Sequence, residues 1–203
     1  QTWNDPGAGK PKPEFAEGQT GAWIAGIHAG VVQFHDGRLL AFGRGNNIDD
    51  RMPMSISEDM GETWAYSPSP FPPIGGGQRL VLLRLQEGPL FFASFTGGLN
   101  DQPTMEVTDV AGQKRSVTGL FTAVSLDEGQ TWSNIRLVSH DGPDRQLETT
   151  NGHPFTMGIS TAEPGGYMAG CQSPDGLIHL ISSKQHYTFN LTWLTTPPPA
   201  VEV

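Results

Sequence analysis

The sequence predicts an all-β fold, and three observations support this. The 203 residues include 26 Gly and 17 Pro, a richness in turn formers that favours many short strands over long helices. Short apolar stretches alternate with turn residues. The clearest is 31–42, where Asp36-Gly37 predicts a hairpin turn. The chain is 36% hydrophobic and 16% charged, which suits a soluble protein with a core of ordinary size.

Two further segments repeat the hairpin of 31–42. Residues 80–95 have their turn at Glu87-Gly88, and residues 167–183 have theirs at Asp175-Gly176. Each segment predicts two adjacent antiparallel strands. Three such hairpins along one chain indicate three similar β units.

Two copies of one octapeptide organise the chain. Residues 57–64 and 125–132 both read S-x-D-x-G-x-T-W. The fixed side chains are Ser57, Asp59, Gly61, Trp64, Ser125, Asp127, Gly129 and Trp132. Serine and aspartate can fold back onto turn amides, glycine permits a positive φ, and tryptophan fills an apolar gap. The pattern predicts the same turn twice, with structural rather than catalytic aspartates.

Four tryptophans recur along the chain at nearly regular intervals. Trp3, Trp64, Trp132 and Trp193 are separated by 61, 68 and 61 residues, enough for one four-stranded unit per interval. The spacing predicts units at about 1–66, 67–134 and 135–203. It also predicts a third strand at 189–194, ended by Pro197-Pro198-Pro199.

The octapeptide resembles the Asp-box, or BNR repeat, of the sialidase (neuraminidase) superfamily, in which the box lies between the third and fourth strands of a propeller blade. Residues 175–180, Asp-Gly-Leu-Ile-His-Leu, are similar to a segment of the last sialidase blades. The resemblance implies a β-propeller of four-stranded antiparallel blades, about three of six or seven being present here. Because Gln1-Thr2-Trp3 reads as the end of another box, we expect a carboxy-terminal part that needs a missing amino-terminal half as its partner.

The resemblance implies a glycoside hydrolase of the exo-sialidase type, acting on a carboxylated sugar of a glycan. In that family three arginines hold the carboxylate, a tyrosine activated by a glutamate attacks, and an aspartate is the acid/base. The family's first arginine and its aspartate come from amino-terminal blades, so we expect this chain to be inactive alone. The resemblance also implies no cofactor and a secreted or periplasmic protein, although residues 1–5 show no export signal.

Candidate site residues lie where the chain enters the first strand of a unit or leaves the second. The first group is His28, Arg44 and Asn46, in and beside a Gly-Arg-Gly-Asn-Asn loop. The second is Arg79, after three glycines, and the third is the loop Lys184-Gln185-His186-Tyr187, which Arg145 could join. We expect catalytic roles for His28, His186 and Tyr187 and substrate-binding roles for Arg44, Asn46, Arg79, Arg145 and Lys184. Guanidinium groups suit carboxylates because they bind them through two hydrogen bonds.

Two other functions fit the same positions. In a propeller lyase or hydrolase of uronic-acid glycans, His28 or His186 would be the base and Tyr187 the acid, with Arg44 or Arg79 neutralising the carboxylate. A non-catalytic glycan-binding propeller is the third possibility, because the scaffold alone does not imply turnover.

Composition argues against several other classes. The formal charge of −9 gives no basic field for nucleic acid or an anionic membrane surface. No apolar run is long enough for a membrane span. Cys171 is the single cysteine, so we expect no intrachain disulfide. His28, His153 and His186 do not have a metal-ligand spacing, so no metal site is expected.

Overall fold

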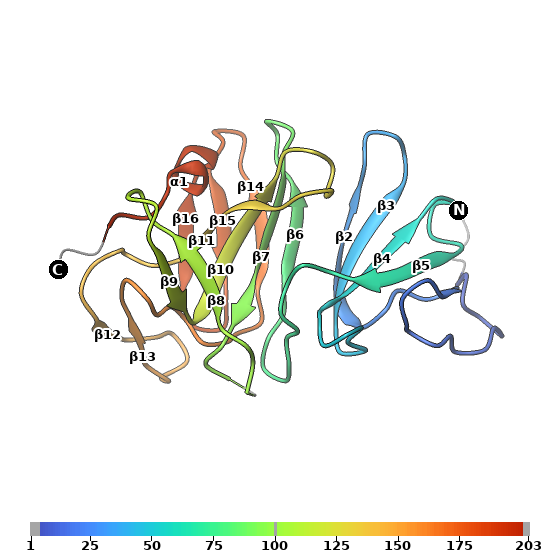
Figure 1. Cartoon of the computed structure of the whole chain (residues 1–203), viewed down its shortest axis with the longest axis horizontal. Coiled ribbons are helices and arrows are strands. Elements are labelled where there is room, and N and C mark those ends of the chain that lie inside the picture. Colours follow the sequence, from blue (N-terminus) through green and yellow to red (C-terminus); the bar gives the residue numbers. More distant parts are fainter. Residues whose placement is uncertain (1–4, 100, 201–203) are drawn as a thin grey trace. The chain divides into compact units, whose positions relative to one another are not determined.

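A computed structural model describes residues 5–99 and 101–200 and confirms the all-β prediction (Figure 1). The strands form antiparallel sheets, and the one helix within the described residues has five residues. The chain divides into two compact units, residues 1–73 and 74–203. No helix among the described residues is both long and apolar enough to cross a membrane.

Unit 1 is built on one antiparallel sheet. Its strands are β1 (Thr20–Gly21), β2 (Ile27–Gln33), β3 (Leu39–Arg44), β4 (Pro53–Ser57) and β5 (Trp64–Pro68), in the order β1-β5-β4-β3-β2. Strands β2 to β5 therefore form a four-stranded meander, in which each strand pairs with the next. Along β5, Trp64 and Tyr66 are buried while Ala65 is exposed, the period-two pattern of a strand with one face in the core.

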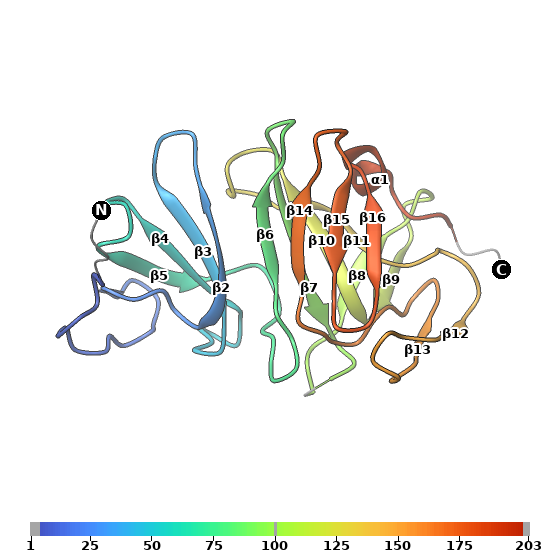
Figure 2. The ribbon, with the colours of Figure 1, turned by 180° about the vertical axis from the view of Figure 1, so that it is seen from behind.

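Unit 2 contains two larger sheets and two small hairpins. The first sheet is a second four-stranded meander, β6 (Val81–Arg84), β7 (Leu90–Thr96), β10 (Gly119–Ser125) and β11 (Ser133–Leu137). The other sheet is β14 (Ala169–Gln172), β15 (Ile178–Ile181) and β16 (His186–Phe189), seen side by side in Figure 2. The hairpins are β8 (Met105–Thr108) with β9 (Lys114–Val117), and β12 (Arg145–Leu147) with β13 (Phe155–Met157). Every residue of β7 and β10 is buried, so these strands form the centre of the unit.

The first octapeptide forms a turn between β4 and β5. Asp59 accepts hydrogen bonds from Thr63 N at 2.8 Å and Thr63 Oγ1 at 2.6 Å, while Ser57 Oγ accepts from Gly61 N at 2.8 Å. Gly61 has φ of +94°, a conformation that costs glycine little. The indole of Trp64 donates to Gly61 O at 3.1 Å, which ties the turn to the next strand.

The second octapeptide repeats this turn between β10 and β11. Asp127 accepts from Thr131 N at 2.8 Å and from Thr131 Oγ1 at 2.5 Å, and Ser125 Oγ accepts from Gly129 N at 2.8 Å. In both copies the donors to the aspartate come from the same turn. The two box aspartates, Asp59 and Asp127, therefore stabilise their own turns.

The hydrogen bonds of the box aspartates predict that the fold loses stability at low pH. Donation by the Thr63 hydroxyl and amide lowers the pKa of Asp59 to about 2, and Thr131 lowers the pKa of Asp127 in the same way. Because these folded-state pKa values lie below the unfolded value of about 3.9, their contribution to stability is present above pH 4 and is lost as pH falls toward 2. Urea unfolding at several pH values should show this loss, and Asp59→Asn should reduce it. An unchanged pH slope in Asp59→Asn would contradict the assignment.

The carboxy-terminal segment corrects one expectation. Residues 189–194 do not form a third strand, because the strand ends at Phe189 and α1 (Leu191–Thr195) follows. Asn190 is the N-cap, and its Oδ1 accepts from Trp193 N at 2.9 Å, a bond that favours helix initiation. Trp193 is therefore a helical residue, while Trp3 lies outside the described residues.

Arg136, on β11, fixes the end of α1. Its side chain is buried, donates to Trp193 O at 2.9 Å and Thr196 O at 2.7 Å, and forms an ion pair with Asp141. The guanidinium also lies over the Trp193 ring, 3.8 Å from its centroid. Burial lowers the pKa of Arg136, while the neighbouring carboxylate and carbonyls stabilise its charge.

Candidate functional site

Three loops of unit 2 meet where β6 and β14 begin and β15 ends. Arg79 N donates to Gly166 O at 3.1 Å, and Arg79 forms an isolated parallel bridge with Tyr167. Tyr167 N donates in turn to Ser183 Oγ at 3.1 Å. The glycine loop before β6 and the turn after β15, which are about a hundred residues apart in sequence, thus lie side by side.

A buried carboxylate, Glu163, is at the centre of this region. Its side chain is fully buried, and its Oε2 accepts from Tyr187 Oη at 2.8 Å and from Ser182 Oγ at 2.7 Å. Ser182 Oγ also accepts from Lys184 N at 2.9 Å and Gln185 N at 3.0 Å, so its single proton points to Glu163. Both hydroxyls therefore act as donors to one carboxylate oxygen.

Burial sets the protonation of this pair. It raises the pKa of Glu163, although the Ser182 and Tyr187 hydrogen bonds oppose the shift. Burial, together with the charge of Glu163, also raises the pKa of Tyr187 far above its usual range. Tyr187 thus keeps its proton in the resting structure, and Glu163 is a stronger base than an exposed carboxylate.

The other carboxylate oxygen of Glu163, Oε1, explains why residue 166 is a glycine. A Cβ placed on Gly166 would lie 2.5 Å from Glu163 Oε1 and 3.2 Å from Ser182 Cβ. No side chain fits there without moving the carboxylate, because real Cβ atoms do not approach other atoms so closely. Gly166 therefore lets the loop before β14 pack directly against Glu163.

Lys184 places a cation at the same strand ends. Its Nζ donates to His153 O at 2.8 Å and lies 5.9 Å from the centroid of the Phe155 ring. The charge of Lys184 also acts to lower the pKa of Glu163. The contact with His153 joins the turn after β15 to the β12–β13 hairpin, which carries Arg145 on its exposed β12 strand.

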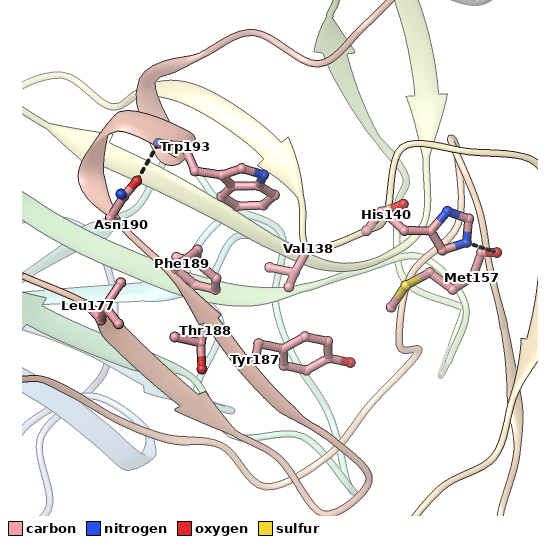
Figure 3. Close-up of a pocket in the computed structure, with 10 residues that line it drawn as sticks. Val138, His140, Met157, Leu177, Tyr187, Thr188, Phe189, Asn190 and Trp193 are labelled. Carbon is pink, nitrogen blue, oxygen red and sulfur yellow. Dashed lines mark hydrogen bonds between the residues drawn. The ribbon is translucent and has the colours of Figure 1, made fainter.

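A pocket of about 430 Å³ runs beside the ring of Tyr187 (Figure 3). Its walls are Val138, Ser139, His140, Met157, Leu177, Tyr187, Thr188, Phe189, Asn190 and Trp193. His140 in this wall is held in place, since Gly142 N donates to its Nδ1 at 3.0 Å and its Nε2 lies 3.1 Å from Met157 O. That arrangement assigns a neutral ring with the proton on Nε2. Tyr187 therefore both lines an open pocket and donates to the buried Glu163.

The structure separates His186 from Tyr187. Both lie on β16 rather than in a loop as expected, and consecutive strand residues point to opposite faces. Tyr187 points to Glu163, while His186 stacks with His179 at a centroid distance of 5.4 Å. The expected pairing of His186 as base with Tyr187 as acid is therefore not assembled.

The first candidate group lies at the end of one hairpin in unit 1. Ile27, beside His28, is the register partner of Arg44 in the β2–β3 pair, and Asn46 follows two residues later. His28 and Asn46 both have φ of +51°, which is uncommon for residues with a side chain. The bulge between Ile27 and Gly30 accounts for the turned backbone at His28.

Sequence reasoning missed Glu163 and Ser182. Glu163 stands in the linker before β14, where no periodicity marks it as buried. The one available indication was its position directly before Pro164-Gly165-Gly166, since paired glycines before a strand permit close packing.

No protein-family model and no curated protein matches the chain. Among solved structures the chain is similar to MPT-4, a mannose phosphorylase from Leishmania mexicana in complex with phosphate ion, at 15% identity and a TM-score of 0.41. The match covers 87% of this chain and 56% of that one, so the chain spans about half the length of that protein.

Proposed function

We propose that the chain forms part of a sialidase-like β-propeller that acts on a carboxylated sugar of a glycan. Its two four-stranded meanders support the propeller, because each would be one blade. The Ser57–Trp64 and Ser125–Trp132 turns support the family, because each joins the third strand of a meander to the fourth, as the Asp-box resemblance implies. Strands β14 to β16 would belong to a third blade.

The observation that carries the catalytic proposal is the 2.8 Å hydrogen bond from Tyr187 Oη to Glu163. A neutral phenol can approach a carboxylated sugar without the repulsion that a carboxylate nucleophile would meet. A buried carboxylate with a raised pKa is suited to take the phenolic proton as attack proceeds. In this proposal Tyr187 is the nucleophile, Glu163 its base, and the adjoining pocket the place of the sugar.

Arg79 and Lys184 are the proposed partners of the sugar carboxylate. Both come from loops at the strand ends that hold Glu163 and Tyr187. A guanidinium can hold a carboxylate through two parallel hydrogen bonds, whereas an ammonium acts as a point charge. We therefore assign the orienting role to Arg79 and a supporting role to Lys184.

The binding test uses the chain with three methyl glycosides, those of N-acetylneuraminic acid, glucuronic acid and galactose. Calorimetric titration should show binding of the acidic sugars and weaker binding of the neutral one. Arg79→Ala should weaken acidic-sugar binding about tenfold, as expected for loss of a charged hydrogen-bond donor. Lys114→Ala, at an exposed pair on β9, is the control. Equal binding of all three sugars, or none, would contradict the proposal.

Turnover distinguishes the functions that share this binding. Release of the fluorophore from a fluorogenic sialoside would support the hydrolase. An unsaturated product from a uronic-acid oligosaccharide would favour the lyase instead. Both assays use the chain together with its expected amino-terminal half, and acidic-sugar binding with neither product would then favour a non-catalytic glycan-binding protein.

A further inference from the structure

Two histidines of the β14–β16 sheet face one another, on the side of β16 opposite to Tyr187. His179 Nδ1, on β15, lies 3.2 Å from His186 Nε2, on β16. The rings are 20° from parallel, with centroids 5.4 Å apart. Both side chains line an open pocket of about 400 Å³ that Cys171 and Ile181 also border. The pair is therefore accessible from this face of the sheet.

The second nitrogen of His179 is held by a polar chain. His179 Nε2 lies 3.1 Å from Ser173 Oγ, and Ser173 Oγ donates to Asp175 Oδ1 at 2.5 Å. With the serine proton given to Asp175, Ser173 accepts a proton from His179 Nε2. His179 Nδ1 then presents a lone pair to His186, and the single proton between the rings belongs to His186.

This geometry is close to that of two metal ligands. Two imidazole nitrogens that each lie about 2.0 to 2.1 Å from a tetrahedral metal ion are about 3.3 Å from one another, and these nitrogens are 3.2 Å apart. The χ2 torsion of histidine is broad, so small ring rotations turn both lone pairs toward one ion. The Ser173 and Asp175 contacts match the outer hydrogen bonds that orient metal-bound histidines.

We propose that His179 and His186 bind a divalent zinc ion, which displaces the proton shared by the two rings. Imidazole is a preferred ligand of zinc. Within residues 5–99 and 101–200 no three His, Cys, Asp or Glu side chains are placed to hold a metal ion, so the two histidines are the protein ligands. The remaining coordination positions open into the pocket. Cys171 is the cross-strand partner of His179 on β14 but is not a ligand in this proposal.

The test is a titration of the chain with zinc chloride in a buffer that does not bind metals. The Cys171→Ser variant serves as the reference, because it removes thiolate binding. We expect one site, with affinity weakened at least tenfold in His179→Gln and in His186→Gln. The imidazole resonances of both histidines should shift on zinc addition in the reference. His35→Gln, at an exposed turn of unit 1, is the matched control and should bind zinc like the reference.

Several outcomes would overturn the site. Unchanged affinity in either Gln variant, or an equal loss in His35→Gln, would identify adventitious surface binding only. No zinc binding by any form would leave the pair as a hydrogen bond. Binding by the wild type that disappears in Cys171→Ser would replace the two-histidine assignment by a thiolate site. Circular dichroism of each variant separates these outcomes from misfolding.

Discussion

Replacing Arg136 by methionine is expected to lower the free energy of unfolding of unit 2 by about 2 to 4 kcal/mol. Removing one partner of a buried ion pair costs about 3 to 5 kcal/mol, and we use a lower range because 20% of the Asp141 side chain is exposed. The substitution also removes the Arg136 donor from Thr196 O and leaves Trp193 O with the longer hydrogen bond from Thr196 N, at 3.3 Å. Urea denaturation followed by circular dichroism measures the loss.

Two variants define what the Arg136 result means. Lys114→Met breaks the exposed pair with Glu106 in the same unit, whose side chains are 66% and 63% exposed, and should cost about 0 to 1 kcal/mol. Arg136→Lys keeps the charge but loses the planar fork and the stacking on Trp193, so an intermediate loss is expected. If Arg136→Met were no more destabilising than Lys114→Met, the ion pair would not be what secures α1.

Replacing Tyr187 by phenylalanine should destabilise unit 2 by about 1.5 to 3 kcal/mol. That is the range for a hydrogen bond to a charged group, and Glu163 is fully buried, with Ser182 as the second donor to Oε2. The measurement is again urea denaturation. Tyr167→Phe is the matched control, because Tyr167 is 45% exposed, so that water can replace its hydroxyl at little cost. Equal effects of the two substitutions would contradict a special role for the Tyr187 hydroxyl.

The contribution of Glu163 to stability changes with pH in the opposite direction to that of the box aspartates. Burial raises the folded-state pKa of Glu163 above its unfolded value, so folding opposes its ionisation. Its contribution is most favourable below about pH 4.3 and declines as pH rises through the folded-state pKa. Glu163→Gln should remove this decline, whereas Asp59→Asn acts only between about pH 4 and pH 2.

The zinc proposal and the sugar proposal can be tested independently of one another. Tyr187 and His186 are neighbours in sequence but lie on opposite faces of β16. Zinc binding is lost with the histidines, and acidic-sugar binding depends on Arg79 and the Tyr187 face. Either proposal can therefore be rejected without affecting the other.

The sequence by itself determined the strand-rich class and its most regular turns. Gly and Pro content predicted all-β, and the S-x-D-x-G-x-T-W pattern predicted two turns because its bonds all lie within eight residues. Asp59 and Asp127 find their partners four residues away, so no long-range information was needed. The hairpin turns at Asp36-Gly37, Glu87-Gly88 and Asp175-Gly176 are local in the same sense, and the structure has a turn at each.

Only the tertiary structure decided which side chains meet. Glu163 lies 24 residues from Tyr187 and 19 from Ser182, and its burial depends on the close packing of Gly166 against it. The face of β16 that each residue occupies follows from its register with β15, which placed Tyr187 inward and His186 beside His179. The segment after Phe189 became a helix because Asn190 caps it and Arg136, more than fifty residues away, binds its last carbonyls. Turns are fixed by neighbours in sequence, whereas sites and helix ends depend on partners that only folding brings within hydrogen-bond distance.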